Sequence, residues 1–268
     1  MDATHEPQRT KTLRALSAAV AALMAVQSAA GLVFPGLYRD ADWIRAAWFG
    51  NDLVTLFVAA PLLAAALVLV RRGSRRAELV WYSVLGYSAY NYAFYLFGGR
   101  MNVLFPLLAA LFVLPVLTLA LALSRADVPA LAAGFRGSTP VRWISAYMLL
   151  TGCGLAIAWL AQWAAFVFGG IEPAIGEEAF GLIAAMDLTF MVPYFVLGGV
   201  LLWRRRPWGY LLGAVMILKG ATYTPVLTLG SVVGALRGVE GSAEQIPIWG
   251  VWTVVGAAAI AALLRHLR

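Results

Sequence analysis

Three charged side chains interrupt the apolar runs of this sequence, and each could do chemistry inside a membrane. Asp52 and Asp187 are carboxyl groups that can bind a proton or a cation, whereas Lys219 is an amine that can hold an anion. An ionised side chain at the centre of a membrane helix costs roughly 2.5–3.5 kcal/mol on insertion scales, so such residues indicate functional sites. Lysine, unlike arginine, can lose its proton when buried. We therefore favour a functional role for Lys219 over that of a structural anchor paired with a carboxylate.

Other polar and aromatic residues share helical spacing with these charges. Thr222 and Tyr223 follow Lys219 at i+3 and i+4, and Tyr194 follows Asp187 at i+7, so each set forms one stripe on its helix. One interpretation is interhelical packing with an aromatic belt. The interpretation we favour is a cavity open to the outer side with convergent polar groups. The predicted ligand-binding residues are Asp52, Asn91, Asp187, Tyr194, Lys219, Thr222 and Tyr223.

Asp187 and Lys219 lie on helices that are consecutive in the sequence, which predicts one polar cluster. Their depths differ by about 7 Å at about 1.5 Å per residue. A link bridged by water, Tyr223 or Tyr194 is therefore expected rather than a tight ion pair.

The residue inventory excludes several kinds of chemistry. The two histidines, His5 and His266, lie in the terminal tails, and Cys153 is the only cysteine. A zinc site, a haem b or a histidine-based triad needs imidazole inside the bundle, and a disulfide needs a second thiol. We therefore expect no cofactor and no metal, and we assign no catalytic residue.

The elements that carry these side chains are membrane helices. The 268 residues are 62% hydrophobic and 12% charged, with a mean hydropathy of +0.81. About 20 apolar residues span a bilayer, so the sequence predicts an all-α integral membrane protein with eight transmembrane helices. The predicted spans are residues 15–34, 50–70, 79–98, 103–123, 143–168, 181–203, 209–230 and 248–264.

Charge predicts the orientation of these spans. With the N-terminus inside, inner segments hold 15 of the 20 Lys and Arg residues, and outer loops hold four. Positive residues favour the cytoplasmic side, so both termini are expected there, in the cytoplasmic membrane of a cell. The net charge of +7 is spread between apolar runs rather than gathered in one patch, so the expected partner is the lipid bilayer and not nucleic acid.

The two halves of the chain resemble each other. Each has an aspartate (Asp52, Asp187) and then a proline (Pro61, Pro193) in its second helix, which ends in arginines. The prediction is two parallel four-helix repeats. Their bounds are residues 15–123 and 143–264, joined by a cytoplasmic linker at 124–142 and flanked by cytoplasmic tails at 1–14 and 265–268.

Two function classes fit these features best. The first is a transporter or ligand-binding membrane protein that takes a small molecule or ion in an outer-half polar cavity, with protonation coupled to binding. The second is a membrane enzyme acting on a lipid-linked substrate, with a carboxylate as general base and Lys219 stabilising an anion. A structural membrane subunit is a third alternative. The scarcity of histidine and cysteine favours binding or transport over catalysis.

Overall fold

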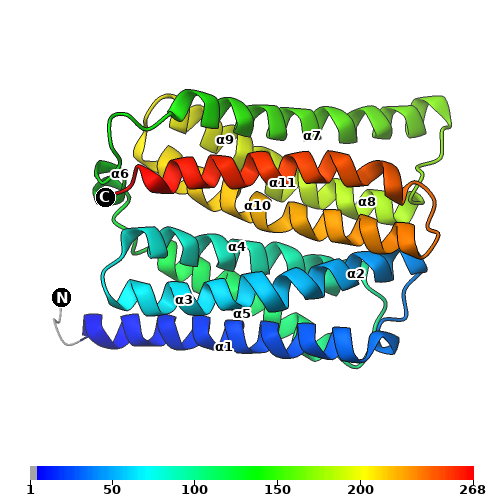
Figure 1. The fold of residues 1–268 in the computed structure, drawn as a ribbon, viewed down its shortest axis with the longest axis horizontal. Helices are drawn as coiled ribbons and strands as arrows, with labels where there is room; N and C mark the ends of the chain where they lie inside the picture. Colours follow the sequence, from blue (N-terminus) through cyan, green and yellow to red (C-terminus); the bar gives the residue numbers. More distant parts are fainter. Residues whose placement is uncertain (1–4) are drawn as a thin grey trace. The chain divides into compact units, whose positions relative to one another are not determined.

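The chain folds into long helices joined by short connections (Figure 1). The structure is a computed structural model that describes residues 5–268, and the fold of this part is all-α. The elements are α1 (His5–Val33), η1 (Pro35–Leu37), α2 (Asp42–Val54), η2 (Thr55–Ala59), α3 (Ala60–Arg71), α4 (Arg75–Gly98), α5 (Phe105–Leu123), α6 (Val128–Ala133), α7 (Val141–Gly169), α8 (Glu177–Met186), η3 (Asp187–Met191), α9 (Val192–Trp203), α10 (Pro207–Leu236) and α11 (Ser242–Arg265).

Seven helical segments of the described chain are long and apolar enough to cross a membrane. They are Lys11–Val33, Asp42–Arg71, Phe105–Leu123, Val141–Gly169, Glu177–Trp203, Pro207–Leu236 and Ser242–Arg265. The chain is therefore an all-α polytopic membrane protein, as its composition predicts.

The span predicted at residues 79–98 is helical but does not meet the same criterion of composition. It forms the 24-residue helix α4, whose tyrosines, serines and asparagine dilute its apolar residues. The count of eight spans therefore does not follow from length and hydropathy alone.

The chain divides into two compact units, of which unit 1 comprises residues 1–126 and 218–260. Within unit 1, α1 packs against α2, α3 and α5, and α4 packs against both α3 and α5 (Figure 1). The polar helix α4 is largely buried, and Tyr87 and Tyr92 are completely buried.

Gly50 of α2 lies close to the second half of α10. A Cβ at this position would lie 2.6 Å from the Val226 carbonyl oxygen and 2.7 Å from the Gly230 nitrogen. Small residues of this kind let membrane helices pack closely.

Unit 2 comprises residues 127–217 and 261–268, and its main contact joins α7 to α9. Glycines again allow the close approach, since a Cβ at Gly152 of α7 would lie 2.9 Å from the Val196 side chain. Helix α9 ends at Trp203 and α10 begins at Pro207, so residues 204–206 form a tight turn and the proline starts the next helix. The boundary between the units falls inside α10 and α11.

Two spans contain a π-helical segment close to a buried aspartate. In the span of α2 and α3 the segment is η2, and it ends two residues before Pro61. In the span of α8 and α9 the segment is η3, which begins at Asp187 and ends two residues before Pro193. A proline lacks the backbone N–H and crowds the carbonyl four residues earlier, and a wider turn relieves that crowding.

Candidate ligand-binding site

Asp52 is the centre of a buried polar network in unit 1. Its side chain is fully buried and accepts three hydrogen bonds. Oδ1 accepts from Gln27 Nε2 at 3.0 Å and from the Tyr95 hydroxyl at 2.8 Å, and Oδ2 accepts from the Tyr38 hydroxyl at 2.7 Å. The carboxyl of α2 is thus tied to α1, to α4 and to the loop between α1 and α2.

A second layer of hydrogen bonds orients these donors. Gln27 Nε2 also donates to the Tyr38 hydroxyl at 2.8 Å, and its Oε1 accepts from the Tyr92 hydroxyl at 2.8 Å. One turn beyond Asp52, the hydroxyl groups of Thr55 and Tyr87 lie 2.9 Å apart. The network therefore fixes the amide orientation of Gln27, whose nitrogen faces Asp52.

Gly31 of α1 makes room for this network. A Cβ at this position would collide with Asp52 Oδ2 and with the Tyr38 hydroxyl. Any larger residue must therefore displace the carboxyl or the phenol, so the network depends on a glycine at position 31.

The groups that surround Asp52 are neutral. Within the described part of the chain, no basic side chain forms an ion pair with this carboxyl. Burial, and then the charge of Asp52, raise the pKa of the Tyr38 phenol above its ordinary value. The Tyr38 hydroxyl therefore keeps its proton at neutral pH and is the donor of the hydrogen bond that Asp52 accepts.

A pocket of about 450 Å³ adjoins the network at the loop between α1 and α2. Gly31 and Tyr38 line it and also contact the network, so Tyr38 lies between the pocket and Asp52. The remaining lining residues include an ion pair, Arg45 with Asp42, and Arg237, whose guanidinium lies 5.9 Å from the Phe49 ring. The pocket therefore combines charged groups at its walls with the phenol of Tyr38.

Lys219 lies in an aromatic cage in the same unit. Its Nζ is 3.2 Å from the centroid of the Tyr90 ring and 4.5 Å from that of Tyr223, and the residue is 3% exposed. The two rings meet edge to face at 5.3 Å, and Phe94 packs on both of them. Ring faces attract a cation, so the cage stabilises the ammonium group of Lys219.

Asn91 lies on α4 between a cage residue, Tyr90, and a network residue, Tyr92. It is fully buried, and neither its amide nitrogen nor its oxygen has a hydrogen-bond partner among the described residues. Ser88 Oγ, one turn earlier, is also buried and has no hydrogen-bond partner among the described residues. Unpaired buried polar groups cost about 1–3 kcal/mol each, so they indicate a place where water or a ligand binds.

The other predicted site residues, Thr222, Asp187 and Tyr194, make none of the contacts described for the Asp52 network or the Lys219 cage. Thr222 is buried, but its hydroxyl donates to the Leu218 carbonyl of its own helix at 2.8 Å. Asp187 belongs to unit 2, is 9% exposed and accepts a hydrogen bond of 2.9 Å from Trp159 Nε1. Tyr194 lies on α9 in the same unit and is 43% exposed. Since Lys219 lies in unit 1, its link to Asp187 stays a prediction.

In the structure, the Lys219 ammonium group contacts the Tyr223 ring, and both residues belong to the predicted site. The residues that hydrogen-bond to Asp52 do not. Gln27, Tyr38, Tyr92 and Tyr95 were not among the predicted ligand-binding residues. Tyr92 and Tyr95 are three residues apart, which places them on one helix face and was the available signal. Tyr38 is in a loop, where no periodicity indicates its direction.

The described residues hold no group of three or more His, Cys, Asp or Glu side chains arranged for a metal ion. The chemistry of the network is instead that of a carboxyl group held by neutral donors, which can exchange a proton. No protein family, curated protein or solved structure was found to match this chain.

Proposed function

We propose that this chain is a membrane transporter that binds a small solute from the outer side and couples its movement to protonation of Asp52. The observation that carries the proposal is a fully buried carboxyl group that neutral donors hold and that Tyr38 separates from an open pocket. An ionised carboxylate without a cation is costly in a membrane, so gain or loss of a proton changes the energy of this region strongly.

The proposal includes a topology of eight spans in which α4 is the third. Short connections at residues 72–74 and 99–104 join α4 to α3 and α5, and it packs against both. Neighbouring helices with such short connections run antiparallel. A helix covered by other helices needs fewer apolar residues than one that faces lipid, which accounts for the tyrosine-rich sequence of α4.

The charge distribution supports both termini on the cytoplasmic side. Inner segments then carry 15 of the 20 basic residues. The loop that contains Tyr38 is outside in this orientation, so the pocket beside it opens to the outer solution. The proposed membrane is the cytoplasmic membrane.

The residues of unit 1 have distinct proposed roles. Asp52 exchanges the proton, and Tyr38 either closes the pocket over it or moves aside to admit water. Lys219, held by Tyr90 and Tyr223, provides a positive charge that stabilises an anionic group of the solute. The unpaired amide of Asn91 supplies a polar contact to water or solute between these two clusters.

Internal duplication remains part of the proposal. Each half carries a span with a π-helical segment that ends two residues before a proline. When the prolines are aligned, the counterpart of Asp187 is Thr55 rather than Asp52, since Asp52 precedes Pro61 by nine residues and Asp187 precedes Pro193 by six. This difference is close to one helical turn, so both aspartates are on similar faces of their helices.

Infrared spectroscopy of the purified protein tests the proton site. The difference spectrum between mildly acidic and alkaline buffer should contain the carbonyl band of a buried protonated carboxyl group. Asp52→Asn should remove this band, and the control Asp42→Asn, which changes a carboxyl group at the pocket wall, should retain it. A band that survives in Asp52→Asn would place the titrating group elsewhere.

Proteoliposomes test the transport. The vesicles enclose a pH-sensitive dye, and amino acids, organic acids, sugars and polyamines are added outside one class at a time. We expect one class to change the lumenal pH in vesicles with the natural protein and not in those with Asp52→Asn. Proton movement that Asp52→Asn leaves intact, or its absence with every class, would contradict proton-coupled transport.

A further inference from the structure

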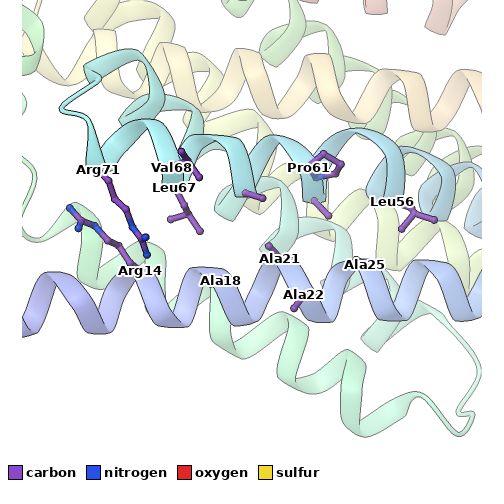
Figure 2. Close-up of a pocket in the computed structure, with 12 residues that line it drawn as sticks. Arg14, Ala18, Ala21, Ala22, Ala25, Leu56, Pro61, Leu67, Val68 and Arg71 are labelled. Atoms are coloured by element: carbon purple, nitrogen blue, oxygen red, sulfur yellow. The ribbon is translucent and has the colours of Figure 1, made fainter.

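A long groove runs between α1 and α3 within unit 1, apart from the Asp52 network (Figure 2). Its volume is about 490 Å³. The residues that line it are Arg14, Ala18, Ala21, Ala22, Ala25, Leu56, Ala60, Pro61, Ala64, Leu67, Val68 and Arg71.

Small side chains form most of the groove. Alanines of α1 provide one wall, and Pro61, Ala64 and Val68 on the exposed face of the second span provide the other. From Arg14 to Ala25 the groove follows α1 for about 17 Å at about 1.5 Å per residue. The hydrocarbon of a bilayer is about 30 Å thick, so this length equals roughly one leaflet.

Two arginines lie together at one end of this apolar groove. Figure 2 shows Arg14 on α1 and Arg71 at the end of α3 with their side chains close to each other. Arg14 Nε is buried and has no hydrogen-bond partner among the described residues. No acidic residue lines the groove, and no ion pair of either arginine occurs in the described part of the chain.

Two neighbouring guanidinium groups repel each other, and an anion between them removes that repulsion. Guanidinium groups bind phosphate with two parallel hydrogen bonds. A phosphate at this end with an apolar tail along the groove has the chemistry of a phospholipid. In the proposed topology this end is cytoplasmic, where the leaflet is rich in anionic lipid.

We infer that the groove between α1 and α3 binds an anionic phospholipid, with its phosphate between Arg14 and Arg71 and one acyl chain along the alanines of α1. Only the choice of leaflet rests on the proposed orientation. The site itself is independent of proton exchange at Asp52.

Native mass spectrometry of the full chain tests this site. The probes are phosphatidylglycerol and phosphatidylcholine with identical acyl chains, so that only the headgroup charge differs. The natural protein should retain phosphatidylglycerol preferentially. Arg14→Gln with Arg71→Gln should lower phosphatidylglycerol affinity by about tenfold or more, since a hydrogen bond to a charged group contributes roughly 1.5–3 kcal/mol.

The control for charge is Arg72→Gln with Arg204→Gln, which removes two exposed arginines outside the groove. This pair should keep the preference for phosphatidylglycerol. An equal loss in both double variants, or no loss in either, would overturn the inference.

The acyl-chain part of the inference has its own variants. Ala22→Trp fills the groove and should reduce binding of phosphatidylglycerol, whereas Ala19→Trp, on an exposed face of α1 outside the groove, should not. Inorganic phosphate at millimolar concentration should not displace the lipid. Displacement by phosphate, or unchanged lipid binding in Ala22→Trp, would show that the groove does not hold an acyl chain.

Discussion

At the scale of single residues, Asp52 is notable for the kind of groups that hold it. Its partners come from α1, the following loop and α4, and all three are neutral donors. Among the described residues, no ion-pair partner therefore compensates for a change in its protonation. In the proposed function, the proton of such a carboxyl group is coupled to the positions of the helices that supply the donors.

Gly31→Ala should destabilise the protein because the added methyl group collides with Asp52 and Tyr38. Overpacking of this kind costs about 1–3 kcal/mol. The matched control is Gly36→Ala, since a Cβ at Gly36 meets no atom within 4 Å. Thermal unfolding in detergent should show a lower Tm for Gly31→Ala alone, and equal values for the two variants would contradict the packing around Asp52.

Tyr95→Phe should also lower stability, since it removes a donor to the Asp52 carboxyl group at 2.8 Å. A hydrogen bond contributes roughly 0.5–1.5 kcal/mol when its acceptor is neutral and roughly 1.5–3 kcal/mol when the acceptor is ionised. Tyr194→Phe, at a residue that is 43% exposed, should change the free energy of unfolding by less than about 0.5 kcal/mol. Unfolding followed by circular dichroism measures both variants. Similar losses of unfolding free energy in Tyr95→Phe and Tyr194→Phe would contradict a stabilising hydrogen bond from Tyr95 to Asp52.

At the scale of elements, the π-helical segments distinguish two spans from the rest of the described helices. Pro115, Pro225 and Pro247 lie inside helices assigned as α, so proline alone does not produce a π segment. The two π segments instead lie at Asp187 and one turn after Asp52. Wide turns of this kind are frequent at functional sites, which agrees with a role for both spans in the proposed function.

The proposed crossing by α4 predicts opposite locations for its two flanking loops. A reporter fused after Gly73 should be cytoplasmic, and one fused after Asn102 should be external. The physical reason is that α4 has 24 residues, enough for about 36 Å at about 1.5 Å per residue, and the neighbouring helices cover its polar groups. Reporters on the same side would mean that α4 does not cross the membrane.

The turn between α9 and α10 depends on Gly209, whose Cβ would collide with the backbone of Leu201 and Leu202. Gly209→Ala should therefore lower Tm, because backbone atoms cannot move aside as a flexible side chain can. Gly181→Ala on α8 meets nothing within 4 Å and should leave Tm unchanged or raise it, since alanine favours a helix by about 0.5–1 kcal/mol over glycine. Equal effects of the two variants would contradict the close packing at this turn.

At the scale of the whole molecule, the eight spans that we propose would place both termini on one side of the membrane. Epitope tags at the N-terminus and at the C-terminus should both be inaccessible to antibody in intact cells and accessible after permeabilisation. The excess of basic residues in the inner segments is the reason for this expectation. A C-terminal tag accessible from outside would favour seven spans.

The sequence by itself determined that the chain crosses a membrane through helices. Apolar length and hydropathy are local properties, and seven of the eight segments that they select coincide with helices long and apolar enough to cross a membrane. The eighth, at residues 79–98, is the helix α4, which neighbouring helices cover and whose polar residues keep it below the same criterion. The rarity of charge in apolar runs likewise identified Asp52 and Lys219, which are both buried in the structure.

Tertiary structure alone decided which side chains surround those charges. Helical spacing gives the face of a residue along its own helix, but it does not give the rotation of one helix against another or the path of a loop. Tyr38 reaches Asp52 because the chain turns back after η1, and Gln27 reaches it because Gly31 lets α1 approach α2. Contacts between residues distant in sequence depend on packing, and no local pattern in this chain encodes them.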